Sequence, residues 1–240
     1  MQESYQPFNK KKEGLHIDRA RPFSEKEIFI IIIALFCALL IFLFPTLNML
    51  QTLIGLITMI IIIPLTLFVK KIAGVEHAMQ IEHSFWIMSR FGFKTKARTK
   101  KPLPMGIILP LVITIISLGY IKPLTFFQFD AENMRWRRIL KAKGYRRGLR
   151  KELMNESDFA FTASYSMYAI LAYAVIMYLL ALFTEFSFFV DSGYYALAYG
   201  AWNLIPVSQL DGAKIFFGSF ITWAILVFLF AILFALVGFF

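Results

Sequence analysis

The residues with the clearest chemical potential lie in the last third of the chain. Asn203, Pro206 and Asp211-Gly212 follow the spacing Asn-x-x-Pro-x-x-x-x-Asp-Gly, a polar, turn-forming island between apolar segments. An aspartate in apolar surroundings is costly unless it pairs with a cation, coordinates a metal or faces water. Asp211 is therefore a candidate metal ligand. The plainer interpretation is an Asp-Gly turn between two helices, with Lys214 either as the ion-pair partner of Asp211 or as a snorkelling cation.

A second group of candidate residues lies near position 80. We expect residues 72–93 to form an amphipathic helix that holds two of the three histidines. His77 and His83 would lie about 120° apart on that helix. They cannot hold zinc as the motif His-Glu-x-x-His does, with two imidazoles one turn apart and the glutamate as general base. His83 is still a candidate zinc ligand beside Asp211, and Glu82 is the nearest candidate base. The alternative is the polar face of a helix at a membrane surface.

These residues together make the chain resemble the site-2 protease family, zinc peptidases that cut inside membranes, and especially its compact archaeal and bacterial forms. The similarity covers roughly residues 47–219, and its specific part is the pattern from Asn203 to Gly212. The resemblance implies that Asp211 is the third zinc ligand. It also implies that Asn203 and Pro206 shape the substrate-facing end of a helix.

The first motif of that family has no clean counterpart here. Alignment on Gly92 places Gln80, Ile81 and Ser84 at the positions of the first histidine, the glutamate and the second histidine. A shift by one residue recovers His83 as a ligand but leaves no histidine or glutamate at the other two positions. Without its base, a metal-bound water lacks a proton acceptor, which typically costs about 10²–10⁴-fold in rate.

Composition predicts an all-α, polytopic integral membrane protein with five or six membrane segments. Of the 240 residues, 59% are hydrophobic and 27 are phenylalanine. The apolar runs approach the roughly 20 residues that cross a bilayer, and they lack the alternation of a barrel. Ser24 to Glu27 is typical of a capping box that opens the first helix. The predicted segments are residues 28–44, 47–69, 103–121, 159–183, 193–205 and 220–240.

The positive charge of the chain is localised. The net charge is +10, and the basic residues concentrate in residues 1–27 and in the loops 70–102 and 122–158. Beside membrane segments, such clusters mark cytoplasmic loops that contact anionic lipid headgroups. We therefore expect a multi-pass protein of the cell membrane with a cytoplasmic N-terminal segment and no nucleic-acid binding. Residues 103–121 have basic flanks on both sides, which favours a re-entrant segment over a plain span.

The resemblance leaves two functions open. The chain is either an atypical intramembrane zinc metalloprotease or a pseudoprotease that binds the transmembrane segments of other membrane proteins. A small transporter or channel component is the alternative, because broken helices and membrane-embedded carboxylates such as Asp211 also occur in transporters. The absence of an inverted repeat argues against this alternative.

Overall fold

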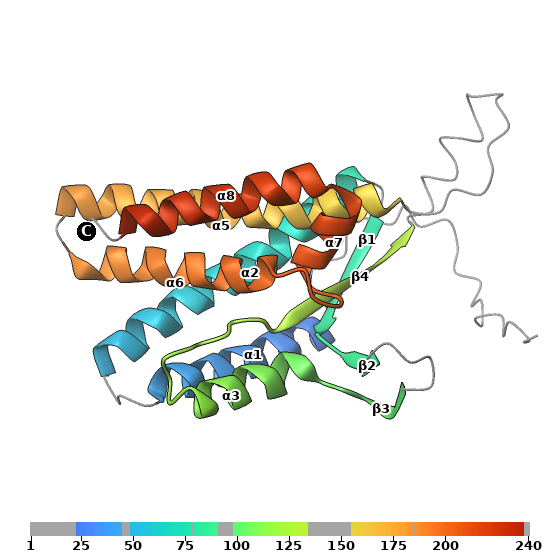
Figure 1. The fold of residues 1–240 in the computed structure, drawn as a ribbon, viewed down its shortest axis with the longest axis horizontal. Coiled ribbons are helices and arrows are strands. Elements are labelled where there is room, and N and C mark those ends of the chain that lie inside the picture. The colour runs from blue at the N-terminus through green and yellow to red at the C-terminus, as the bar shows by residue number, and fades with distance from the viewer. Residues whose placement is uncertain are drawn as a thin grey trace, which may run out of the picture.

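The computed structural model describes residues 23–44, 49–77, 79–90, 98–133, 155–184 and 186–237. The chain is largely helical, with four short strands in the described part (Figure 1). In chain order the elements are α1 (Glu25–Leu43), α2 (Met49–Glu76), β1 (Met79–Phe85), β2 (Met88–Arg90), β3 (Arg98–Leu103), α3 (Met105–Ile116), β4 (Phe127–Asn133), α5 (Glu156–Thr184), α6 (Ser187–Leu204), α7 (Asp211–Gly218) and α8 (Phe220–Val237).

The helices form two sides joined by α2. On one side α5, α6 and α8 pack together, and α7 lies across one end of α5 (Figure 1). On the other side α1 packs against α2 and α3. Inside the bundle, Thr58 of α2 donates a hydrogen bond to Ser192 of α6 (2.9 Å), and Ser192 also bonds with the Tyr173 hydroxyl of α5 (2.8 Å). This buried chain of hydroxyl groups holds the three central helices in register.

The first helix begins where the capping box predicts. The Ser24 hydroxyl accepts a hydrogen bond from the backbone N–H of Glu27 (3.3 Å), and the Glu27 carboxylate accepts one from the N–H of Ser24 (2.8 Å). The predicted helix start is therefore confirmed to within a turn. The side chain of Glu27 is also buried, so its carboxylate faces other elements of the fold rather than solvent.

The prediction of a helix over residues 72–93 is wrong beyond Glu76. After α2 ends, the chain forms β1, which pairs antiparallel with β4 from Met79 opposite Asn133 to Phe85 opposite Phe127. Met79, Ile81 and His83 are buried while the residues between them are less so, which is the period of two of a half-buried strand. The second small sheet pairs β2 with β3. The fold is therefore mostly helical rather than all-α.

Residues 103–126 form a hairpin made of one helix and an extended return. Helix α3 ends at a turn in which Leu118 and Gly119 adopt positive φ, and the chain then runs back to β4 (Figure 1). Trp86 joins both ends of this hairpin, because its N–H donates to the carbonyl of Phe126 and its carbonyl accepts from the N–H of Gly106, each at 2.9 Å. The segment therefore leaves and returns at the same end of the molecule.

Three described helices are long and apolar enough to cross a bilayer: α1, α2 and α5. At 1.5 Å per residue, the 19 residues of α1 extend about 28 Å, close to the hydrocarbon thickness of a membrane. Helix α3 has only 12 residues, about 18 Å. Large apolar side chains are exposed along α1, α2, α5 and α8, including Phe29, Ile61, Phe183 and Phe228.

Candidate functional site

Asp211, the central residue of the sequence analysis, forms a buried ion pair. It is the first residue of α7, and its Oδ2 lies 2.5 Å from Nζ of Lys70 on α2. Only 3% of each side chain is exposed. The cation that neutralises Asp211 is therefore Lys70, rather than the Lys214 that the turn interpretation predicts.

The local chain path explains why Asp211 points inward. Gly212 packs against the end of α6 so closely that a Cβ at this position would lie 2.1 Å from the carbonyl oxygen of Leu204. Only glycine leaves room for this approach. Lys70 reaches Asp211 from within α2, because this helix continues to Glu76, past residue 69, where we expect the membrane segment to end. Lys70 is consequently an interior residue of a helix rather than its polar edge.

Asn203 and Pro206, the predicted substrate-facing residues, lie at the end of α6 and in the loop after it. The side chain of Asn203 is buried, and its Nδ2 donates to the carbonyls of Tyr199 (2.7 Å) and Leu124 (3.1 Å). Asn203 thus fastens α6 to the extended return of the α3 hairpin. Pro206 is exposed. Neither residue makes a hydrogen bond or ion pair with Asp211 in the described part of the chain.

Glu27 forms the centre of a second buried group. Its Oε2 lies 2.6 Å from Nζ of Lys71, and its Oε1 accepts hydrogen bonds from the backbone N–H and from Nδ1 of His83, each at 3.0 Å. Burial lowers the pKa of His83 from 6.5 to about 4, against the opposing effect of the bond to Glu27. At neutral pH the imidazole is therefore neutral and donates from Nδ1.

Lys214 joins α7 to the sheet. Its ammonium donates a hydrogen bond to the carbonyl of Phe129 on β4 and lies 3.4 Å from the centroid of the Phe129 ring. Burial lowers the pKa of Lys214 to about 8, and the charge of Lys70 acts in the same direction while that of Asp211 opposes it. With Glu27, Lys70, Lys71, His83 and Asp211, this residue completes what we call the charged cluster.

The structure separates the predicted catalytic base from the predicted ligands. Glu82 lies on β1 opposite Asp130, and its side chain is exposed, whereas that of its neighbour His83 is buried. Sequence reasoning missed Glu27, Lys70 and Lys71, which make the actual contacts. Two adjacent lysines within an apolar helical run are the signal that could have found them, because buried lysines require anionic partners.

The donor groups of the charged cluster do not fit zinc. A catalytic zinc site uses three protein ligands and an open position. Asp211 Oδ1 and His83 Nε2 make no hydrogen bond within the described residues, but they are only two donors. No set of three or more His, Cys, Asp or Glu side chains in the described segments could hold one metal ion. The ammonium of Lys70 would also repel a metal ion, because it pairs with Asp211 and its charge acts on His83.

A scan against protein-family models finds no match, and searches of curated proteins and of solved structures find none either. The site-2 protease resemblance therefore rests on the pattern from Asn203 to Gly212 and stays a prediction.

Proposed function

We propose that this chain is a multi-pass membrane protein with a site-2 protease-like helical core that does not hydrolyse peptides and instead binds transmembrane segments of other membrane proteins. The observation that carries the proposal is the buried pair of Lys70 and Asp211. In this pair Lys70 already binds Asp211, the residue that the family resemblance identifies as a zinc ligand.

The membrane placement is supported by the length and surface of the helices. Helices α1, α2 and α5 could cross a bilayer, and apolar side chains cover much of their exposed surface. The charged cluster lies at the end of the molecule where α1 begins and where α2 approaches α7 (Figure 1). In our proposal this end faces the cytoplasm, together with the N-terminal segment and the basic loops, whose headgroup contacts follow from their charge.

The proposed lack of peptide hydrolysis is supported by what α2 presents to Asp211. In a zinc peptidase with the motif His-Glu-x-x-His, the helix supplies two imidazoles at positions i and i+4. Here α2 presents Lys70 to Asp211, and the residue four positions later is Gly74. A Cβ on Gly74 would lie 2.5 Å from Cδ1 of Ile81 and 3.1 Å from the carbonyl of Met79, so an imidazole there would have to displace the side chain of Ile81. The Lys70 ammonium supplies the positive charge that a metal ion would supply in a peptidase.

Helix α8 offers a surface against which a second transmembrane helix can pack. It packs on α6 and α7. Its exposed apolar residues Ile221, Ile225, Phe228 and Ile232 recur at intervals of three and four, which places them in one stripe along the helix. Such a stripe matches the ridge that a second helix packs against, and van der Waals packing is a main source of helix association in membranes.

Co-reconstitution with a defined helix tests this proposal. The full chain, labelled with a donor dye, and a single-span leucine/alanine peptide with an acceptor dye are placed in lipid vesicles. We expect energy transfer above the level of random collisions, displacement by unlabelled peptide, and an intact peptide on gels. Ile225→Ala/Phe228→Ala should weaken the transfer, while the exposed pair Ile60→Ala/Ile61→Ala on α2 serves as the matched control. Cleavage of the peptide, or transfer no greater than collisions, would overturn the proposal.

A transporter or channel component is the competing function. The observation in its favour is the set of buried charges. Ionisable groups inside a membrane bundle often mark ion or proton paths. Here Glu27, Lys70, Lys71 and Asp211 are each held in an ion pair, so that moving an ion past them would require those pairs to open. Flux of protons or monovalent ions in proteoliposomes, measured beside the Asp211→Asn variant, separates this function from helix binding.

A further inference from the structure

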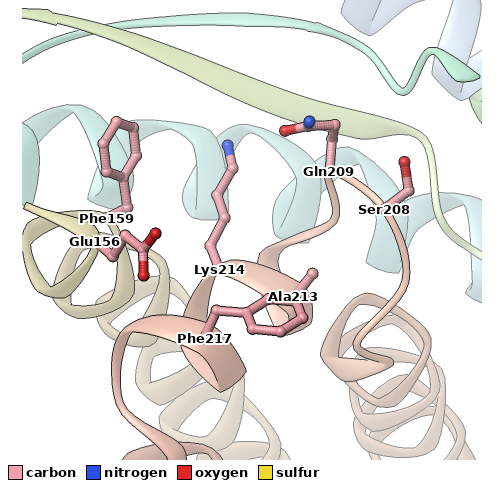
Figure 2. Close-up of a pocket in the computed structure, with 7 residues that line it drawn as sticks. All are labelled: Glu156, Phe159, Ser208, Gln209, Ala213, Lys214 and Phe217. Atoms are coloured by element: carbon pink, nitrogen blue, oxygen red, sulfur yellow. The ribbon is translucent and has the colours of Figure 1, made fainter. Parts of the chain in front are cut away.

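A pocket of about 300 Å³ opens beside the charged cluster, between the first turn of α5, the loop before α7, and α7 itself (Figure 2). It is lined by Glu156, Phe159, Ser208, Gln209, Ala213, Lys214 and Phe217. Figure 2 shows Lys214 rising from α7 between Phe159 and Gln209 toward the strand above. Lys214 belongs to the charged cluster, whereas the other residues that line this pocket belong neither to the cluster nor to the helix-binding stripe on α8.

The pocket presents one charge of each sign. The cation is Lys214, which spends one of its three N–H donors on the carbonyl of Phe129 and keeps two for a ligand. The anion is the exposed Glu156 at the start of α5. Both residues line the pocket, and no ion pair joins them, so each can pair with a separate group of one bound molecule. Gln209 and Ser208 add an amide and a hydroxyl.

The remaining residues that line the pocket are apolar, and they extend from the interior to the surface. Phe159 and Ala213 line the interior beside Lys214, and Phe217 lies at the surface with 71% of its side chain exposed. Phe220, also exposed, begins α8 three residues later. An apolar chain attached to a polar group in the pocket would therefore find an aromatic surface along its exit path. A ligand with a charged head and an apolar tail fits this arrangement better than a small soluble ion.

We propose that this pocket binds the headgroup of phosphatidylethanolamine, with its primary ammonium on Glu156 and its phosphate on Lys214, Gln209 and Ser208. The proposal rests on the membrane placement given above, since the acyl chains need a bilayer beside Phe217. A purely anionic headgroup would leave Glu156 facing negative charge. A choline headgroup has no N–H to donate to the Glu156 carboxylate, which removes the hydrogen bond that strengthens such a pair.

Native mass spectrometry of the full chain in detergent, titrated with lipids of equal acyl composition, tests the proposal. We expect phosphatidylethanolamine to bind at least about fivefold more tightly than phosphatidylcholine or phosphatidylglycerol. Glu156→Gln should remove this preference, and Gln209→Ala should weaken binding of all three lipids, because it removes a phosphate contact. Glu25→Gln, which neutralises an exposed carboxylate on α1, is the matched control and should change nothing.

Three results would overturn the assignment. They are equal binding of the three lipids by the wild type, an unchanged preference in Glu156→Gln, and binding of free phosphoethanolamine as tight as that of the lipid. The last result would assign the pocket to a soluble zwitterion instead. None of these measurements involves a transmembrane peptide or zinc, so their failure is distinguishable from failure of the proposed function.

Discussion

Lys70 in the last third of α2 and Asp211 at the first residue of α7 meet in the interior with 2.5 Å between Nζ and Oδ2. The pair joins two elements that are 141 positions apart (211 − 70). Lys71, the next residue along α2, points to a different partner, Glu27 at the start of α1. Two adjacent lysines on one helix thus fasten it to the start of α1 and to the start of α7.

Breaking the Lys70–Asp211 pair from one side should be strongly destabilising. Lys70→Met or Asp211→Asn leaves the other charge buried without its partner, and each should lower the free energy of unfolding by about 3–5 kcal/mol. The double variant should lose much less than the sum of the two single losses. Unfolding in mixed detergent micelles measures all three. The exposed variants Lys26→Met and Glu25→Gln should stay within about 0.5 kcal/mol. Additive losses in the double variant would mean that the two residues do not interact.

Gly212 should be far less tolerant of a methyl group than Gly55. A Cβ on Gly212 would lie 2.1 Å from the backbone carbonyl of Leu204, which cannot move without displacing the end of α6. A Cβ on Gly55 would meet the ring of Phe42 at 2.7 Å, and a side chain can shift. We expect Gly212→Ala to lower the thermal midpoint in detergent clearly more than Gly55→Ala does. Equal shifts would show that the tight approach of α7 to α6 is not needed.

The stability of the chain should depend on His83 at mildly acidic pH. The pKa of His83 is about 4 in the folded protein because the ring is buried, and 6.5 is its ordinary value in an unfolded chain. Between these values the unfolded chain binds more protons, so the free energy of unfolding falls as the pH is lowered from about 6.5 to about 4. Parallel unfolding curves should show a shallower fall for His83→Gln. The same pH slope in both proteins would contradict the assignment of a neutral, buried imidazole.

The hairpin of α3 should be accessible from one side of the membrane at both of its ends. In a Cys37→Ala background, single cysteines at Leu103, just before the hairpin, and at Asp130 on β4, just after it, should react with an impermeant maleimide from the same side of sealed vesicles. Phe183, with 85% of its side chain exposed at the far end of α5, should react from the opposite side. Labelling of positions 103 and 130 from opposite sides would show that this segment crosses the bilayer.

The helices and the inward position of Asp211 were predictable from the sequence. Long apolar runs fix where α1, α2 and α5 lie, and an Asp-Gly pair between apolar segments identifies the turn at Asp211. The role of Lys70 was harder to predict, because the expected end of the membrane segment at residue 69 rests on the convention that paired lysines mark a membrane edge. That convention overlooks the alternative that Lys70 finds a carboxylate inside the fold.

The strand β1 and the partners of the charged cluster depend on contacts that are distant in sequence. The alternation of Met79, Ile81 and His83 is compatible with a strand, but its partner β4 begins only at Phe127, and nothing local specifies that pairing. Likewise, Glu27 satisfies a helix cap by itself, and its bonds to Lys71 and His83 arise only when three elements meet. Local patterns therefore predict the long helices, whereas β1 and the charged cluster arise from tertiary packing.

Zinc content of the detergent-purified full chain, measured by elemental analysis beside Asp211→Ala, tests the central claim most directly. If Lys70 supplies the positive charge that Asp211 needs, wild type and variant should both hold far less than one zinc per chain, even after incubation with excess zinc and removal of the loosely bound ion. Near-stoichiometric zinc in the wild type that disappears in Asp211→Ala would contradict this account and restore the metalloprotease hypothesis.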